Sequence, residues 1–382
     1  MEARRPGILA EIEALVRCES PSADLDAVAA SAALVAAVGR RHLGTGPETI
    51  VSDGRTHLRW RLGSGRLPSP GAAGADPGPR VLVLAHHDTV WPLGSLETHP
   101  FSVTDGVLRG PGCFDMKAGL VLALHALAEL GRPSGVTLLV TGDEELGSPS
   151  SRELIESEAA GCAAALVLEA SADGGALKTA RKGVSLYQVR AVGRAAHAGL
   201  EPERGVNATL ELAHQVLAVS GLADAAVGTT VTPTAMSAGT VSNTVPAAGA
   251  FSVDVRMWDP DEQRRVHAAM SSLLPVVPDA VLQVSGGPNR PPLPASSSAG
   301  LFGVAVRLAE TLGLPGLRSA EVGGASDGNF TAGVGTPTLD GLGAVGGGAH
   351  ADHEHVLVDA LPGRAALLAA LIDELLRGTD GV

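Results

Sequence analysis

Three short and almost uninterrupted apolar runs predict the strands of a sheet that is buried on both faces. They are Arg80–Ala85, Gly135–Thr141 and Ala163–Leu168. Strands covered on both faces have continuous apolar runs, whereas half-exposed strands alternate. A helical stretch at Ala118–Leu130 lies between the first two runs. This region is therefore expected to alternate β and α units on a largely parallel sheet.

The two ends of the chain have helical periodicity instead. Apolar residues recur at helical spacing from Ile8 to Val16, and an Ala-rich helix is expected over 24–43. Further helices are expected over 301–312 and 364–376.

The middle of the chain has a different order of elements, namely strand, helix, strand, strand, helix and strand. They are expected at 184–192, 207–219, 229–239, 249–257, 261–274 and 280–285. This order is that of a ferredoxin-like module. The prediction is a large α/β domain of residues 1–177 and 288–382, with helices on both faces of its sheet, and an inserted domain of residues 178–287.

Composition and charge limit the possible partners. The chain has 382 residues, which suffices for two cores, and its formal net charge is -13 with 2% aromatic residues. Such a chain would be repelled by phosphate backbones and has few rings to stack on bases, so neither nucleic acid nor an anionic membrane is an expected partner.

The lack of an expected targeting signal and the pattern of cysteines both favour a cytoplasmic protein. Glu11 and Glu13 interrupt the apolar N-terminal positions, and no later segment approaches twenty uncharged apolar residues, so neither a signal peptide nor a membrane span is expected. Cys18, Cys113 and Cys162 are odd in number and far apart. This suits a reducing compartment and argues against a thiolate zinc site, so any metal would bind to His and carboxylate side chains.

Acidic and histidine side chains follow the predicted buried strands. His86 and Asp88 come after the first, Glu144 and Glu145 after the second, and Glu169 ends the third. Ligands of open α/β sheets bind at the carboxyl ends of the strands. Each motif alone also fits a surface turn or a solvated acidic loop, but an unpaired buried carboxylate is costly, so their shared edge indicates a cation site.

Two further motifs belong to the same prediction. Asp115 lies in the glycine-rich turn Gly110–Gly119, where alone it could simply cap a helix. His350 lies in the segment Gly346–His355, which alone fits a His-rich surface loop. One His, one Asp and one Glu per metal, with the Asp shared, would hold two zinc ions with open positions for water and substrate.

Taken together, these motifs resemble the dizinc metallopeptidases and deacylases that include glutamate carboxypeptidase, acetylornithine deacetylase and succinyl-diaminopimelate desuccinylase. The resemblance covers nearly the whole chain and is strongest to the glutamate carboxypeptidase branch. It implies that His86, Asp115 and Glu169 hold one zinc, and that Asp115, Glu145 and His350 hold the other. His86 is preferred over His87 by its spacing to Asp88, and His350 over His353 and His355 by its spacing to Glu354.

The resemblance also assigns the other catalytic roles. Asp88 would orient His86. Glu144 would be the general base that takes a proton from the attacking water and returns it to the leaving amine, because a carboxylate free of metal is the better base. Cobalt or manganese is expected to be able to replace zinc.

Residues of the inserted domain are implied to bind substrate and to form a homodimer. His197 would reach into the partner's site and polarise the scissile carbonyl. Arg256 and Asn243 are similar to residues that bind the substrate carboxylate, for which the planar guanidinium of an arginine is suited. Gly324, Lys182 and Arg290 are further candidates for substrate binding. The expected substrate is a small peptide or an N-acyl amino acid.

Three other functions remain open at this stage. One is an N-acyl-amino-acid deacylase of the acetylornithine deacetylase type. A second is a serine esterase, because Gly324–Gly328 fits a nucleophile elbow around Ser326, followed by Asp340 and His350 in the order of a hydrolase triad. However, no buried strand leads into this elbow. The third is a non-catalytic binding protein.

Overall fold

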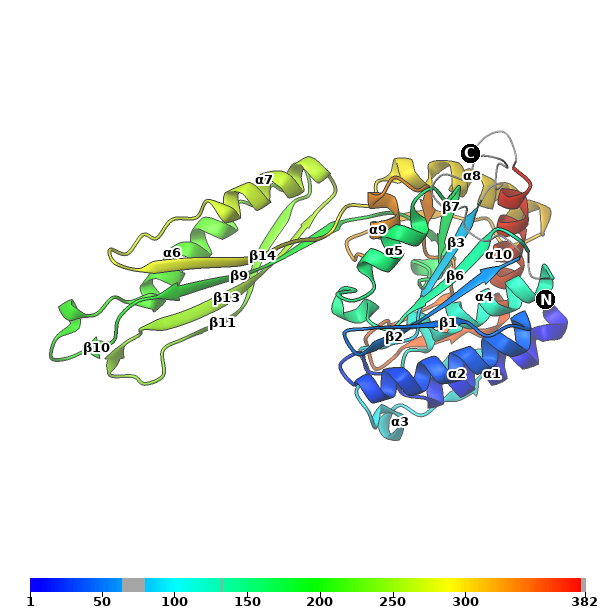
Figure 1. Ribbon diagram of the computed structural model, residues 1–382, viewed down its shortest axis with the longest axis horizontal. Helices are drawn as coiled ribbons and strands as arrows, with labels where there is room; N and C mark the ends of the chain where they lie inside the picture. Colours follow the sequence, from blue (N-terminus) through cyan, green and yellow to red (C-terminus); the bar gives the residue numbers. More distant parts are fainter. Residues whose placement is uncertain (64–79, 132, 379–382) are drawn as a thin grey trace. The chain divides into compact units, whose positions relative to one another are not determined.

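The computed structural model describes residues 1–63, 80–131 and 133–378, and in it the chain divides into two compact units (Figure 1). Unit 1 comprises Met1–Ala180, Leu293–Val322 and Ser326–Val382. Unit 2 comprises Arg181–Pro292 and Gly323–Ala325. Within the described residues, no helix is both long enough and apolar enough to cross a bilayer.

A six-stranded sheet of order β1-β2-β6-β3-β7-β16 forms the centre of unit 1. Four neighbouring strands run parallel: β6 (Val136–Thr141), β3 (Val81–His86), β7 (Ala164–Val167) and β16 (Thr338–Leu339). The antiparallel strands β2 (Arg55–Leu62) and β1 (Glu48–Ser52) extend the sheet beyond β6. The predicted α/β class with a largely parallel sheet is confirmed.

Side chains of the central strands alternate between two apolar cores. Val81, Val83 and Ala85 of β3 belong to the core shared with α1, α2, α4, α8 and α10, whereas Leu82 and Leu84 pack with α5 and α9. The bounds of these helices are α1 Arg5–Arg17, α2 Leu25–Leu43, α4 Ala118–Glu129, α5 Arg152–Ala159, α8 Ala295–Thr311, α9 Gly328–Gly333 and α10 Leu361–Leu376. Because both faces are covered, the strands carry continuous apolar runs.

The remaining elements of unit 1 are short. A four-stranded sheet has the order β17-β18-β5-β4, and β15 pairs with β8. The bounds are α3 Ser95–Thr98, β4 Ser102–Thr104, β5 Val107–Arg109, β8 Leu177–Arg181, β15 Ser319–Val322, β17 Gly346–Gly347 and β18 His355–Leu357.

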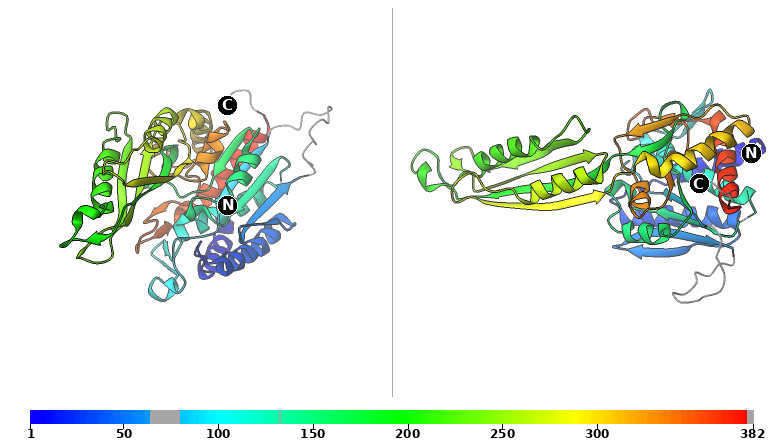
Figure 2. Two further views of the ribbon diagram at one scale, coloured as in Figure 1. Left: turned by 60° about the vertical axis from the view of Figure 1, so that its left-hand side comes forward. Right: turned by 90° about the horizontal axis from the view of Figure 1, so that it is seen from above.

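Unit 2 has the predicted ferredoxin-like order of elements. Its antiparallel sheet has the order β11-β13-β9-β14, and its two helices share one core with one face of that sheet (Figure 2). The bounds are β9 Gly183–Val192, β10 Ala196–His197, α6 Ala208–Ser220, β11 Thr230–Ala238, β12 Thr244–Val245, β13 Ala248–Met257, α7 Pro260–Ser271 and β14 Val281–Arg290. β14 pairs with β9 as far as Arg290, so the boundary expected between residues 287 and 288 falls inside a strand.

Candidate metal centre

Three neighbouring parallel strands bring the first predicted side chains to one edge of the sheet. His86 is the last residue of β3, and Glu144 and Glu145 begin a short helical turn just after β6. Glu169 lies two residues beyond the end of β7. Because β6, β3 and β7 are adjacent and parallel, their carboxyl ends meet at this edge.

The turn before α4 carries Asp115, and the carboxylate of Glu354 fixes its backbone. That carboxylate accepts hydrogen bonds from the backbone N–H groups of Gly112 (2.9 Å), Phe114 (2.8 Å) and Asp115 (3.0 Å), and from Nε1 of Trp91 (2.7 Å). Glu354 is 3% exposed. In the sequence, Glu354 only helps to select His350 by its spacing, and this anchoring role could not be predicted from that spacing.

Each oxygen of the Asp115 carboxylate faces a different histidine. Oδ1 lies 3.3 Å from Nε2 of His86, and Oδ2 lies 3.4 Å from Nε2 of His350. A second carboxylate approaches each ring: Glu169 Oε1 is 3.5 Å from Nε2 of His86, and Glu145 Oε2 is 3.2 Å from Nε2 of His350. The five side chains predicted as ligands therefore lie together as two His–carboxylate groups that share Asp115.

Several polar atoms of these side chains have no partner among one another, and divalent metal ions would supply one. Nε2 of His86, Oδ1 of Asp115 and Oε1 of Glu145 are buried without a hydrogen-bond partner. Leaving buried polar atoms unpaired costs free energy, and a cation between nitrogen and oxygen ligands would remove that cost. Ligand atoms of His86, Asp115 and Glu145 lie within 4.8 Å of one another, as do those of His86, Glu144 and Glu169.

The electrostatics of the site favour positive charge. Hydrogen bonds to Asp115 and Glu145 raise the pKa of His350 to about 10. Burial tends to raise the pKa of Asp115, but its contacts with His350 and His86 outweigh burial and hold that pKa well below its usual range. Without metal, protons therefore occupy this site, and an arriving cation has to displace them.

Asp88 connects the ends of β3 and β6. Its carboxylate accepts a hydrogen bond from the Ser22 hydroxyl (2.6 Å) and from the backbone N–H groups of Glu144 (3.3 Å) and Glu145 (3.2 Å). The carboxylate is 3.5 Å from Nδ1 of His86, whereas the backbone carbonyl of Asp88 is nearer at 3.0 Å. Asp88 therefore contacts Nδ1 of His86 with its backbone carbonyl as well as with its carboxylate, and its role in orienting that ring stays a prediction.

The structure distinguishes the predicted ligands His86 and His350 from the histidines next to them in the sequence. His87 points away from the acidic cluster, with Nδ1 3.2 Å from the Ser31 hydroxyl and Nε2 3.0 Å from the Thr56 carbonyl. Likewise, Nδ1 of His355 is 3.0 Å from the carbonyl of His353, whereas His350 faces Asp115 and Glu145. Of these histidines, His86 and His350 are the ones that meet the carboxylates.

The residues predicted for substrate binding all belong to unit 2. Both Nε and Nη2 of Arg256 donate to the carboxylate of Asp254, at 2.7 and 2.8 Å. Lys182 donates to the Gly228 carbonyl at 2.5 Å and lies over the Trp258 ring.

The other predicted unit 2 residues differ in exposure. His197 is exposed, and its Nδ1 accepts a hydrogen bond from the backbone N–H of Gly199 (3.1 Å). Asn243 is also exposed, and its backbone carbonyl accepts a hydrogen bond from the Ala198 N–H. The Gly324 carbonyl accepts from Arg181 Nη1 at 3.0 Å, whereas Arg290 is buried.

Ser326 does not have the surroundings of a catalytic serine. It is 0% exposed, and its hydroxyl donates directly to the Asp340 carboxylate at 2.6 Å. His350, the third member of the proposed triad, lies against Asp115 and Glu145 instead. The serine esterase alternative is therefore wrong.

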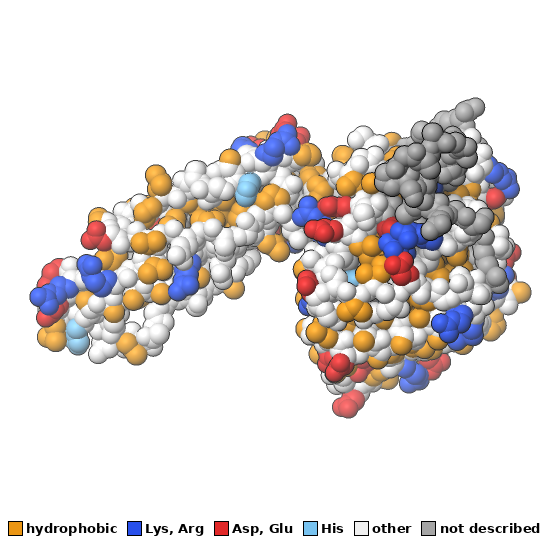
Figure 3. All heavy atoms as spheres, viewed as in Figure 1, with side chains coloured by type: hydrophobic (Ala, Val, Ile, Leu, Met, Phe, Trp, Pro, Cys, Tyr) orange, Lys and Arg blue, Asp and Glu red, His pale blue; other side chains and the backbone are white. Residues whose placement is uncertain are grey.

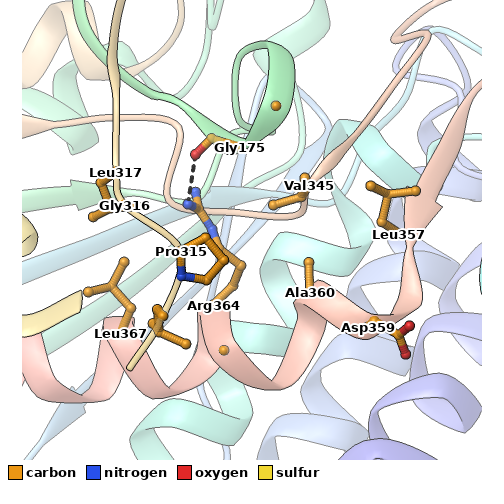
Figure 4. A pocket seen from close by; sticks show the side chains of 13 residues that line it. Gly175, Pro315, Gly316, Leu317, Val345, Leu357, Asp359, Ala360, Arg364 and Leu367 are labelled. Atoms are coloured by element: carbon orange, nitrogen blue, oxygen red, sulfur yellow. Dashed lines mark hydrogen bonds between the residues drawn. The ribbon is translucent and has the colours of Figure 1, made fainter. Parts of the chain in front are cut away.

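A cavity of about 380 Å³ lies elsewhere in unit 1, between α10 and the segment after α8 (Figure 4). Leu314, Pro315 and Leu367 are among its apolar lining residues, and the lining includes none of the predicted ligands. Arg364 at this cavity donates to the carbonyls of Gly175 (3.2 Å), Gly343 (2.9 Å) and Gly341. It thereby supports the segment that leads to β17 and His350.

Comparison with known proteins gives the family. A model of the peptidase family M20/M25/M40 matches residues 82–374. The chain belongs to this family. The family resemblance expected from the five motifs is thus confirmed.

Relatives and structures of M20 proteins resemble the chain over different lengths. Carboxypeptidase G2 of Pseudomonas sp. (strain RS-16) is 32% identical, over 97% of this chain and 90% of the relative. Succinyl-diaminopimelate desuccinylase of Anaplasma marginale (strain Florida) is 43% identical over a shorter stretch, 18% of each chain. The M20 family metallo-carboxypeptidase Sso-CP2 from Sulfolobus solfataricus shares the fold, with a TM-score of 0.76 at 14% identity, over 97% of this chain and 99% of that one.

Proposed function

We propose that this M20 chain is a metal-dependent hydrolase that cleaves an amide bond adjacent to a free carboxylate, in the manner of a glutamate carboxypeptidase. The observation that carries the proposal is the position of Asp115, whose two carboxylate oxygens face two different histidines. Each histidine also faces its own glutamate. This arrangement provides ligands for two metal ions that share one carboxylate. The similarity to carboxypeptidase G2 over most of the chain supports the reaction type.

Zinc is the proposed metal, because mixed histidine and carboxylate ligands with open positions are typical of catalytic zinc sites. Cobalt and manganese are proposed substitutes. When bound, two such ions would lower the pKa of water and polarise the scissile carbonyl.

Glu144 is the proposed general base. It is 9% exposed, its backbone is held by Asp88, and one of its carboxylate oxygens lies within 4.8 Å of ligand atoms of His86 and Glu169. Glu145, the next residue, faces His350. Glu144 takes the proton from the attacking water and delivers it to the leaving nitrogen, while Glu145 stays in the ligand set.

Replacement of Glu144 tests this division of roles. Glu144→Gln should lower kcat by about 10²- to 10⁴-fold, the usual contribution of a general acid–base group, while the protein keeps its metal. Glu145→Gln, the matched control one residue away, should lose metal as well as activity. Atomic absorption after dialysis, together with kcat on a C-terminal glutamyl substrate, separates the two outcomes. Full activity of the Glu144→Gln enzyme would refute the assignment.

Arg256 and Asn243 are the proposed contacts for the substrate carboxylate. Because Asp254 already occupies two donors of Arg256, the substrate would share or displace that pairing. Arg256→Ala should raise KM for substrates with a free carboxylate far more than for the corresponding amides. Equal effects on both would remove the basis for this contact.

A second candidate activity is the removal of an acyl group from an N-acyl amino acid. The match to a succinyl-diaminopimelate desuccinylase favours it. The two activities differ in the group on the amine side of the scissile bond, so kcat/KM on a panel of C-terminal dipeptides and N-acyl amino acids distinguishes them. No turnover of either class by the zinc-loaded protein would favour a non-catalytic binding role.

A homodimer formed through unit 2 is the proposed assembly. β11 is an edge strand of its sheet and is largely exposed. The neighbouring helix α6 exposes Leu210 and Leu217, which lie two turns apart on the same face. Hydrophobic side chains are visible on the surface of unit 2 in Figure 3. An exposed edge strand beside exposed apolar side chains is suited to pairing with a second copy.

A cytoplasmic location is proposed from the cysteines. Cys18, Cys113 and Cys162 are all free thiols, and the last two are buried. Free thiols are usual in reducing compartments.

A further inference from the structure

A second group of metal-binding side chain types lies where three helices of unit 1 meet. Glu11 comes from α1, His42 from α2 and His125 from α4. The three side chains are largely buried, with exposed fractions of 15%, 13% and 5%. None of them was predicted from the sequence as a metal ligand, and none belongs to the site around Asp115.

Both imidazole rings turn the same nitrogen toward one carboxylate. Nε2 of His42 lies 3.0 and 2.8 Å from the two oxygens of Glu11, and Nε2 of His125 lies 3.0 Å from Oε2. The ring centroids of the two histidines are 4.4 Å apart. Nδ1 of His125 is buried without a hydrogen-bond partner, so this ring makes its polar contact through Nε2.

These separations are close to those between the ligands of a zinc ion. Zinc binds imidazole nitrogen and carboxylate oxygen at about 2.0–2.2 Å, so ligands of a tetrahedral ion lie about 3.3 Å from one another. All three ligand atoms here lie within 4.8 Å of one another. The nitrogen–oxygen separations of 2.8 to 3.0 Å are a few tenths of an ångström shorter than that, so the side chains would move apart by this amount to admit an ion.

The local charge also suits a cation. Burial tends to raise the pKa of Glu11, but its hydrogen bonds to His125 and His42 outweigh burial and hold that pKa well below its usual range. The carboxylate is therefore ionised. Arg41 also touches it, at 3.3 Å, but that side chain is 60% exposed and can turn into solvent.

We propose that Glu11, His42 and His125 bind one additional divalent transition-metal ion, of the zinc type, at a structural site separate from the one around Asp115. Two His and one Glu leave a fourth position for water. The ion would connect α1 and α2 to α4, the helix that begins three residues after Asp115. Because it binds the folded chain, it would stabilise that chain against unfolding.

Metal counting on the full-length protein tests the site. After saturation with zinc and removal of loose metal, Glu11→Gln should hold one ion fewer per chain than the wild type. Glu13→Gln is the matched control, because Glu13 lies on the same helix and pairs with Arg17. It should hold as many ions as the wild type. An equal count in Glu11→Gln and the wild type would overturn the proposal.

A second variant isolates the new site from the proposed catalytic one. Asp115→Asn should lose the ions that share Asp115 and keep one, and zinc should raise its Tm. Adding His42→Gln to Asp115→Asn should abolish both the remaining ion and the rise in Tm. If the catalytic metals are absent altogether, the wild type binds one ion and Glu11→Gln binds none, so the two proposals fail separately. A zinc-independent Tm in Asp115→Asn, with no bound ion, would also overturn the inference.

Discussion

Glu354 connects a residue near the end of the chain to the turn that presents Asp115. Its carboxylate accepts four hydrogen bonds, three of them from backbone N–H groups of that turn. A glycine is needed in the turn at residue 112, where φ is +67° and a Cβ would lie 2.4 Å from Cγ2 of Thr89. The position of Asp115 therefore depends on side chains that do not themselves face the metal site.

Glu354→Gln is expected to weaken the hydrogen bonds that hold Asp115 in position. The amide nitrogen cannot accept the hydrogen bonds that a carboxylate oxygen accepts, and charge-assisted bonds contribute about 1.5–3 kcal/mol each. Metal affinity should fall about 10- to 100-fold, as is usual when groups that orient ligands are changed. A chelator-competition titration measures this fall.

Trp91→Phe serves as the control for that experiment. It removes a single donor to Glu354 and leaves the three backbone bonds in place. Its metal affinity should change far less. If Glu354→Gln bound metal as tightly as the wild type, the anchoring role would be refuted.

His87 should make the stability of the protein sensitive to acid. Burial lowers its pKa to about 4, against the opposing charge of Asp88. Between an unfolded value of about 6.5 and pH 4 the unfolded chain binds more protons at this residue, so the folded state loses stability as the pH falls through that window, by up to about 3 kcal/mol.

Comparison with His87→Gln measures this contribution. The free energy of unfolding of the wild type, relative to His87→Gln, should fall between pH 7 and pH 4.5 in metal-free buffer. His214→Gln, at an exposed position of α6, is the control and should not reproduce the change. A constant difference across this range would contradict the prediction.

At the level of single residues, the acidic and histidine side chains at strand ends could be predicted from the sequence. His86, Glu145 and Glu169 could be placed together because buried parallel strands end at one edge. The anchoring by Glu354 and the group at Glu11 could not be predicted, because they depend on contacts between residues more than 100 positions apart, or on three helices meeting. Spacing along the chain does not encode such contacts.

At the level of elements, continuous apolar runs predicted β3, β6 and β7 closely, whereas β1 and β2 were missed. In β2, Leu58, Trp60 and Leu62 are buried and alternate with Arg59 and Arg61. This alternation is typical of a strand with one buried face, but it occupies few residues. Pairing with β6 and β1 stabilises it as a strand.

Because α4 lies very close to the end of β7, we expect that Gly119 cannot be replaced by a larger residue without cost. A Cβ there would lie 2.2 Å from the carbonyl oxygen of Leu168, next to Glu169. Gly119→Ala should therefore destabilise the fold by about 1–3 kcal/mol, as overpacking does. It should also weaken metal binding, because α4 and Glu169 would have to separate. Chemical denaturation and a metal titration measure both effects.

Gly303→Ala is the matched control in another helix of unit 1. A Cβ at Gly303 in α8 meets nothing within 4 Å. Alanine should stabilise that helix by about 0.5–1 kcal/mol relative to glycine. A neutral or stabilising effect of Gly119→Ala would show that α4 can shift without consequence.

At the scale of the whole molecule, the proposed role of His197 in the partner's site can be tested by mixing inactive variants. In a hybrid dimer of Glu144→Gln and His197→Asn, the site with an intact Glu144 would receive its His197 from the other subunit. Random pairing would then restore about a quarter of the wild-type activity in an equal mixture, since half of the dimers are hybrids with one complete site each.

The same experiment distinguishes a role of His197 in the partner's site from a role in its own chain. If His197 acted within its own chain, every site of a hybrid would lack one group, and the mixture would stay as inactive as the separate variants. Sedimentation of the mixture shows that subunits have exchanged. A monomer in that measurement would contradict the proposed assembly.

The carboxylate of Asp88 has a consequence for how the family could diversify. One side chain holds the backbone of both Glu144 and Glu145, so a change at Asp88 is expected to disturb the proposed base and the proposed ligand together. A related protein in which Glu144 alone is replaced would be expected to lose hydrolysis and still bind the ions. Asn243 and Arg256, the proposed contacts for the substrate carboxylate, lie in the other compact unit, so a change in those contacts would not act through Asp88.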